Sequence, residues 1–301
     1  MRYHLKLTTL LVSLCLACAV GAQPAPPSDQ AKVAIEADTS DASLAKVVLI
    51  AGSKSHGRGD HEYYAGMTLL MKMLRQTPGV FPVLVVDGWP KNEKILDGAK
   101  CIAVFSDGGG GQPFTKGTRA EVIQRYVDKG VGLVHLHYAV DYPKGAAGDR
   151  ALGWLGGYYE GGYSTNPTWT ADFKQLPDHP IARGVSPFRL DDEWYYNMRF
   201  VGDMKGVAPI LEAVPPDRSR GTPVAKEHPG RAEIVAWAFD RPDGGRSFGF
   251  TGGHFHRNWA NDDFRRVVTN AILWTAKVEV PKDGAKVDLK PGDMDMTLDA
   301  Q

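Results

Sequence analysis

The stretch KVVLIAG (46–52) is a continuous run of aliphatic, mostly β-branched residues that ends in glycine. Such a run predicts a strand buried on both faces, as in a parallel sheet covered by helices. The segment 62–77 then carries apolar residues at helical spacing, and Pro78 and Gly79 stop it. A buried strand followed by an amphipathic helix is the beginning of a strand–helix–strand unit, so this stretch predicts an α/β protein.

The same alternation of strand and helix continues through the first half of the chain. Apolar runs predict strands at 81–88, 100–111 and 131–139, and helical spacing predicts a helix at 118–130. This order favours a doubly wound, mostly parallel sheet with helices on both faces, which is the expected fold class.

The second half has a looser pattern. Its glycine- and tyrosine-rich beginning gives way to strands near 208–214, 233–240 and 246–253 and to a closing helix over about 262–277. There is no internal repeat. We therefore expect one α/β domain that carries an insertion, and not two separate domains.

The first residues of the chain have the pattern of an export signal. Arg2 and Lys6 precede an apolar run, and residues 20–22 (VGA) fit the cleavage rule of small residues. The run is too short to span a membrane, so we expect no membrane span and a periplasmic or secreted protein. A lipoprotein anchored through Cys18 is the weaker alternative, because Cys15 stands where a leucine-like residue is expected.

These patterns divide the chain into a signal peptide at 1–22, a disordered spacer at 23–45, an α/β domain at 46–280 and a polar tail at 281–301. Removal of the leader leaves Cys101 as a lone cysteine, which cannot form an internal disulfide. The fold must then be stable through its core alone. Cys101 lies in an apolar run and is expected to be buried and inert.

Charge and motif content exclude two classes of ligand. The chain has 35 basic and 35 acidic residues without a block of like charge, so nucleic acid is a poor candidate partner. The glycine-rich motifs GxGxxG and GxxxxGK[ST] are absent from the strand ends, so no nucleotide cofactor is expected. The four glycines that follow Asp107 suit either a ligand-binding backbone or a tight turn.

Ligands of open parallel sheets bind beyond the carboxyl ends of the strands. After the first strand, His56 and His61 lie in a glycine-containing loop, which indicates a site loop or a polar loop that caps the next helix. In GLVHLHYA (132–139), His135 and His137 share a face if the strand stays regular. His137 is nearer the open end and is expected to be functional, whereas His135 is either functional or structural.

The segment DDEWYYN (191–197) places Glu193 beside Trp194 and Tyr195. A carboxylate next to aromatic rings suits acid–base chemistry and stacking on sugar rings. A solvated turn leading into a strand is the simpler alternative.

The segment FGFTGGHFHRNW (248–259) repeats the pattern of a buried strand that runs into histidines. His254 and His256 share a face if the chain stays extended. Together with His137, with His56 or His61, and with a carboxylate, they make a plausible set of ligands for one divalent metal, such as zinc, manganese or iron. A metal-free acid–base site built from the same residues remains equally open.

Several of these motifs together resemble the ThuA-like (trehalose utilisation) family of the class I glutamine amidotransferase-like superfamily. The resemblance covers about residues 46–280 and is carried, in order, by HGRGDHEYYAG (56–66), GLVHLH (132–137), DHPIARGV (178–185), DDEWY (191–195), RSFGFTGGHFHRNW (246–259) and FRRVVTNAILW (264–274). It implies a flavodoxin-like, doubly wound α/β domain and a role in bacterial metabolism of sugars, including keto forms.

The resemblance also exposes a departure from the superfamily. Its amidotransferases place a nucleophilic cysteine on a tight elbow after a central strand, where this chain has His137. Cys101 lies on a different strand, and a glutaminase needs the thiolate for its covalent step. We therefore expect no glutaminase activity.

Two functions remain open. The first is an exported enzyme that acts on a keto-sugar or glycoside by elimination, hydrolysis or isomerisation, and the second is a non-catalytic sugar-binding or scaffold protein. Clustered imidazoles favour the enzyme, because ring stacking alone does not need them. The expected catalytic residues are His137, Glu193 and His254, and the expected substrate-binding residues are His61, Asp107, Tyr138, Trp194 and Tyr195. Oligomeric state stays open.

Overall fold

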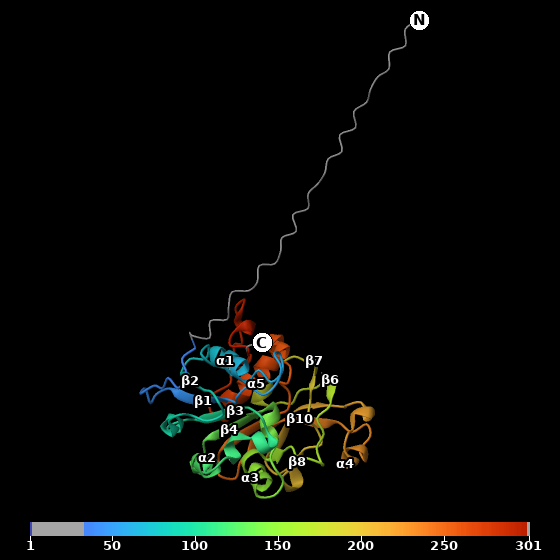
Figure 1. Cartoon of the computed structure of the whole chain (residues 1–301), viewed down its shortest axis with the longest axis horizontal. Helices are drawn as coiled ribbons and strands as arrows, with labels where there is room; N and C mark the ends of the chain where they lie inside the picture. Colours follow the sequence, from blue (N-terminus) through green and yellow to red (C-terminus); the bar gives the residue numbers. More distant parts are fainter. Residues whose placement is uncertain (2–32, 300–301) are drawn as a thin grey trace.

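The computed structural model describes Met1 and residues 33–299, so the expected signal peptide lies outside the described residues apart from Met1. Its centre is a seven-stranded sheet in the order β2-β1-β3-β4-β11-β10-β9 (Figure 1). From β2 to β11 neighbouring strands are parallel, and β10 runs antiparallel to both its neighbours. The strands are β1 (Ala45–Ala51), β2 (Val80–Val85), β3 (Cys101–Phe105), β4 (Gly132–Leu136), β9 (Val207–Ala213), β10 (Glu233–Asp240) and β11 (Arg246–Phe250). The expected fold class is confirmed.

Strand β1 shows why the predicted run forms the centre of the sheet. Val47, Leu49 and Ala51 belong to the core on one face, whereas Val48 and Ile50 belong to the core on the other. All five side chains are fully buried. A run without polar alternation therefore marks a strand that has no solvent-facing side.

Helices cover both faces of the sheet (Figure 1). Two lie over one face, α1 (Tyr63–Leu74) and α5 (Asp262–Thr275), and two over the other, α2 (Arg119–Val127) and α3 (Ala146–Leu155). Helix α5 begins where the Asn261 side chain accepts the N–H of Phe264 at 2.9 Å, which satisfies one of the free donors of its first turn. None of the helices among the described residues is long and apolar enough to cross a membrane.

The insertion lies between α3 and β9 and contains two small antiparallel sheets. One joins β5 (Gly157–Tyr158) to β8 (Arg199–Phe200), and the other joins β6 (Thr168–Phe173) to β7 (Phe188–Glu193). A short helix, α4 (Pro223–Lys226), follows β9.

Both ends of the domain differ from the expectation. The described part of the spacer lies along the edge strand β2, where Glu36 donates its N–H to the carbonyl of Leu84 at 2.7 Å. The segment after 280 is not a free polar tail, because Ala285 and Val287 are buried in the core beside α5. Nearer the end, Thr297 donates a hydrogen bond to Thr68 of α1 at 3.0 Å. Apolar residues spaced among charged ones dock this segment on the helices.

His135 is part of the core and lies away from the site described below. Its ring packs against Phe114, and its Nε2 lies 2.8 Å from the hydroxyl of Tyr142. Its Nδ1 is buried and has no hydrogen-bond partner among the described residues. Burial lowers the pKa of His135 to about 3.

We expect His135→Leu to make the free energy of unfolding depend less on pH below neutrality. Between the unfolded pKa of about 6.5 and the folded pKa of about 3, the unfolded chain binds the proton more readily, so stability falls as pH drops. Leucine removes this contribution. Urea unfolding at pH 7 and pH 4 should show that the variant loses less stability than the native chain, by about 3 kcal/mol.

Phe114→Leu is the matched control, since it disturbs the same part of the core and keeps the imidazole. It should lower stability by a similar amount at both pH values. Parallel pH profiles for His135→Leu and the native chain would contradict the assignment.

Candidate metal centre

Four side chains from distant parts of the sequence meet at one point. His61 follows β1, His137 follows β4, His254 follows β11, and Glu193 is the last residue of β7. The ligating atoms of these four residues all lie within 4.8 Å of one another. Three of them come from the carboxyl ends of parallel strands, which is where open α/β sheets place their ligands. We call this group the histidine cluster.

A sharp turn of the backbone directs His137 into the cluster. Strand β4 ends at Leu136, and His137 has a φ of 54°, in the left-handed region. The prediction that His135 and His137 share a face is therefore wrong, because strand alternation stops one residue earlier. His61 also lies in the left-handed region, with a φ of 51°, and this backbone turn directs its ring into the cluster in the same way. Such conformations cost free energy for residues with a side chain and recur at functional sites.

The glycine-rich loop after β3 packs against the segment that follows this turn. A Cβ at Gly108 would lie 2.0 Å from the carbonyl oxygen of Tyr138, so only glycine lets the two backbones approach so closely. Among the four glycines, this one is required by packing against the segment that follows His137. The close approach of the two backbones therefore explains why residue 108 is a glycine.

The imidazole nitrogens of the cluster are close together. Nε2 of His61 lies 2.8 Å from Nδ1 of His254 and 3.0 Å from Nε2 of His137. Oε2 of Glu193 lies 3.2 Å from Nδ1 of His254 and 3.5 Å from Nε2 of His137. Three nitrogens and one carboxylate oxygen thus face a common centre.

The remaining nitrogen of each imidazole faces an acceptor outside the cluster. His61 Nδ1 lies 2.7 Å from the hydroxyl of Tyr63, which itself donates to Asp107 at 2.7 Å. His137 Nδ1 lies 2.7 Å from the carbonyl of Thr251, which can only accept.

The third imidazole follows the same pattern. His254 Nε2 lies 3.8 Å from the carboxylate of Asp60. When the outer nitrogen carries the proton, the inner one presents a lone pair to the centre, and this is the arrangement of metal-binding histidines.

Asp192 fixes the loop that carries His254. Its carboxylate accepts the backbone N–H of Gly253 at 2.7 Å and that of His254 at 3.1 Å. Because Asp192 precedes Glu193 on β7, these bonds hold two members of the cluster next to each other. Asn166 donates to Oε1 of Glu193 at 3.1 Å and leaves Oε2 for the cluster.

Burial and the neighbouring charges keep Glu193 ionised and His61 neutral at neutral pH. Burial, together with the neighbouring histidines, lowers the pKa of His61 to about 4, although Asp107 opposes this. Burial alone would raise the pKa of Glu193, but hydrogen bonds and charge from His137 and His254 outweigh it and bring the pKa to about 2. Glu193, together with the charges of Asp60 and Asp192, raises the pKa of His254 against the effect of its burial. Imidazole and carboxylate donors of this kind fit zinc, manganese or iron.

A group of tyrosines borders the cluster. The Tyr195 hydroxyl lies 3.4 Å from Nε2 of His137, and Tyr195 packs against Tyr138 and Tyr159. Burial raises the pKa of all three tyrosines, and charge on Asp141 and on Glu193 raises it further in each case, so both carboxyl groups act on these hydroxyls.

Asp141 is a residue that the sequence did not single out. Its carboxyl group makes no hydrogen bond or ion pair with the described residues, and burial raises its pKa to about 7.

Two residues expected in the site are elsewhere. The chain turns after Phe255 into a short 3₁₀ segment, so His256 lies away from His254 and its Nε2 donates to the carbonyl of Met294 at 2.8 Å. Trp194 is fully buried and packs edge-on against Phe250. The expectations of a metal ligand at 256 and of a sugar-stacking ring at 194 are therefore wrong.

His56 and Asp107 lie at the rim of the cluster. The exposed ring of His56 is 3.6 Å from that of His61, between centroids. Ser55 links His56 Nδ1 to Asp107, with 2.7 Å to each. Asp107 therefore supports His61 through Tyr63, and His56 covers the outer side of the cluster without belonging to the four.

Fold and site together define a class of protein: a doubly wound α/β domain that gathers histidines and a carboxylate at the carboxyl ends of its strands. The chain belongs to the ThuA family, described by trehalose utilisation, whose model matches residues 47–275. Among curated proteins, none matches the chain.

Solved structures show the same fold. A ThuA-like protein from Bacteroides uniformis, 15% identical, aligns with a TM-score of 0.56 over 79% of this chain and 94% of its own. A ThuA-like protein from Parabacteroides merdae, 18% identical, aligns with a TM-score of 0.54 over 81% of this chain and 95% of its own.

Proposed function

We propose that this protein is an exported enzyme that uses one divalent metal to act on a keto-sugar glycoside. The observation that carries the proposal is the convergence of three imidazole nitrogens beside a carboxylate, with acceptors for the outer nitrogens. A sugar-binding protein has no need of such a cluster. Membership of a family described by trehalose utilisation supports a carbohydrate substrate.

In this proposal His61, His137 and His254 hold the metal and Glu193 acts as a base. A metal at this position would polarise the carbonyl oxygen of the substrate. Glu193 is ionised at neutral pH, and Asn166 orients its second oxygen. The tyrosines that border the cluster supply hydroxyls for the hydroxyl groups of the sugar.

The reaction that fits this arrangement is elimination from a glycoside oxidised at ring carbon 3. The carbonyl acidifies the hydrogen on carbon 2, and Glu193 removes it as a proton. The electron pair forms the double bond between carbons 1 and 2 while the bond from carbon 1 to the glycosidic oxygen breaks. Asp141, with a pKa of about 7, can supply the proton to the leaving oxygen. No net oxidation occurs, so a separate enzyme must make the keto group.

Glutaminase activity is not proposed. The position after β4 holds His137, and Cys101 is a fully buried residue of β3 whose thiol pKa is raised by burial. A covalent step on a thiolate therefore has no candidate nucleophile in the described part of the chain.

The test combines metal analysis with turnover. Untagged protein should contain about one equivalent of metal by elemental analysis, and it should convert a 3-keto-glucoside to the unsaturated keto-sugar and free alcohol. A chelator should abolish this activity, and the metal should restore it. Metal-free protein with full activity, or tight binding of the sugar without turnover, would overturn the proposal, and the second result would favour a sugar-binding protein.

A further inference from the structure

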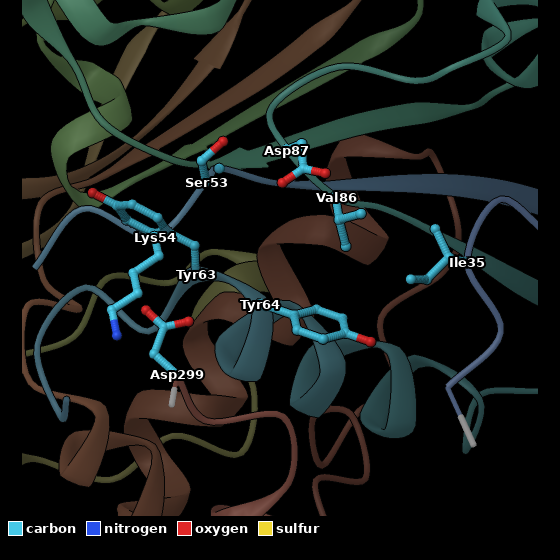
Figure 2. Close-up of a pocket in the computed structure, with 9 residues that line it drawn as sticks. Ile35, Ser53, Lys54, Tyr63, Tyr64, Val86, Asp87 and Asp299 are labelled. Atoms are coloured by element: carbon cyan, nitrogen blue, oxygen red, sulfur yellow. The ribbon is translucent and has the colours of Figure 1, made fainter. Parts of the chain in front are cut away.

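Two adjoining cavities form a groove across the carboxyl ends of β1, β2 and β3. The first has a volume of about 280 Å³ and is bordered by Tyr63, Tyr64 and Asp299 (Figure 2). The second has a volume of about 270 Å³ and is bordered by Asp107, Lys116 and Arg119. Both are lined by Gly52, Ser53 and Asp87, so they meet at these residues. Together they reach the size of ordinary small-molecule sites.

The groove lies where doubly wound sheets usually bind ligands. In the order β2-β1-β3 the chain changes direction across the sheet between β1 and β3, and a crevice forms at this switch point. Helix α1, which follows β1, and helix α2, which follows β3, cover opposite faces (Figure 1). The loops that lead to them therefore separate and leave the groove between them.

Two polar side chains without a hydrogen-bond partner among the described residues lie where the cavities meet. Figure 2 shows Ser53 and Asp87 near each other at one end of the first cavity. Both are exposed, and neither side chain makes a hydrogen bond or ion pair with the described residues. Asp87 has a φ of 59° in the turn Asp87–Gly88, a conformation that aspartate tolerates, and this turn places its carboxylate at the groove. A hydroxyl beside a carboxylate pairs well with neighbouring hydroxyls of a sugar.

The charge of the groove favours a neutral ligand. Its lining contains three cations and three carboxylates, namely Lys54, Lys116, Arg119, Asp87, Asp107 and Asp299. A phosphate or a sugar acid would meet as much negative as positive charge. A polyol can donate to the carboxylates and accept from the cations, and the half-buried ring of Tyr64 offers an apolar surface for the face of a sugar ring.

Asp107 connects this groove with the histidine cluster. Its carboxylate lines the second cavity and accepts the hydroxyl of Tyr63, which contacts His61. We propose that the groove is a second carbohydrate subsite, which binds one neutral hexose unit while the other unit of the same substrate reaches the cluster. This inference rests on the proposed function and names its substrate class as a neutral disaccharide or longer glycoside.

The test is calorimetry on the full mature chain with trehalose, methyl glucoside and glucose 6-phosphate as probes. We expect trehalose to bind, and Asp87→Asn and Lys116→Ala each to weaken its binding at least 10-fold. Methyl glucoside, which can fill only one subsite at a time, should bind the native chain more weakly than trehalose. Arg125→Ala is the matched control, because Arg125 is an exposed cation of the same helix α2 outside the groove. It should leave binding unchanged.

Binding is measured without turnover, so this result stands apart from the proposed reaction. His254→Ala should still bind trehalose through the groove even when activity is lost. Unchanged binding in Asp87→Asn, or glucose 6-phosphate binding more tightly than trehalose, would overturn the inference. Activity confined to keto-monosaccharides with full binding in all variants would also overturn it and leave the proposed function intact.

Discussion

Replacement of His254 by alanine is expected to abolish stoichiometric metal binding. His254 Nδ1 lies 2.8 Å from His61 Nε2 and 3.2 Å from Glu193 Oε2, at the middle of the proposed ligand set. Loss of one of three nitrogen ligands leaves a metal with too few strong donors, so affinity should fall at least about 100-fold. Elemental analysis and zinc titration of apo protein against a competing chelator measure this change.

His256→Ala is the matched control for this prediction. His256 is only two residues away and is more deeply buried than His254, but it binds Met294 and lies outside the cluster. Metal content of the folded variant, with folding checked by circular dichroism, should equal that of the native protein. If both variants bind metal alike, the histidine cluster is not a metal centre. This result would support the alternative of a metal-free acid–base site.

Glu193→Gln is expected to lower kcat by about 10²- to 10⁴-fold while metal content is kept. Glutamine has the same shape and its oxygen can still accept from Asn166, but it cannot remove a proton. With three imidazoles left, the metal should remain bound. Steady-state kinetics on a 3-keto-glucoside, together with metal analysis of the same preparation, separates the two roles.

The control for Glu193→Gln is Asp191→Asn, which removes a carboxylate from an exposed position of the same strand β7. Its kcat should remain within about 2-fold of the native value. Loss of the metal in Glu193→Gln would make Glu193 a ligand and not the base. Unchanged kcat would place the base on another residue.

The strands of the central sheet and the helices α1, α2 and α5 were predictable because their signals are local, whereas α3 and the short strands of the insertion were not predicted. The run 46–52 is buried on both faces, as its uninterrupted apolar sequence indicates, and the helices at 119–127 and 262–275 lie within a few residues of their predicted bounds. The tail after 280 was misjudged because isolated residues such as Ala285 carry little pattern, although they pack well against helices that lie far away in the sequence.

The site was predictable only in part. His137, Glu193 and His254 were found because imidazoles and carboxylates at strand ends are unusual. Regular alternation paired His137 with His135 and His254 with His256, and the backbone breaks that regularity after each strand. His61 was expected to bind the substrate or, as the alternative to His56, the metal, and the structure places it in the cluster and His56 at the rim.

Other site residues give no local signal in the sequence. Tyr63 reads as one apolar position of an amphipathic helix, yet its hydroxyl lies between His61 and Asp107. Asp141 reads as an ordinary loop aspartate, and only tertiary packing raises its pKa. Roles of this kind arise from contacts between distant segments, which composition and spacing do not encode.

The left-handed backbone at His61 and His137 has a consequence for variants made more stable. A residue with a Cβ costs roughly 1–2 kcal/mol in that region. Glycine at either position would relieve this cost, but it would also remove an imidazole from the cluster. The two positions therefore place local stability and the geometry of the cluster in conflict, and variants made more stable at these positions should lose the site.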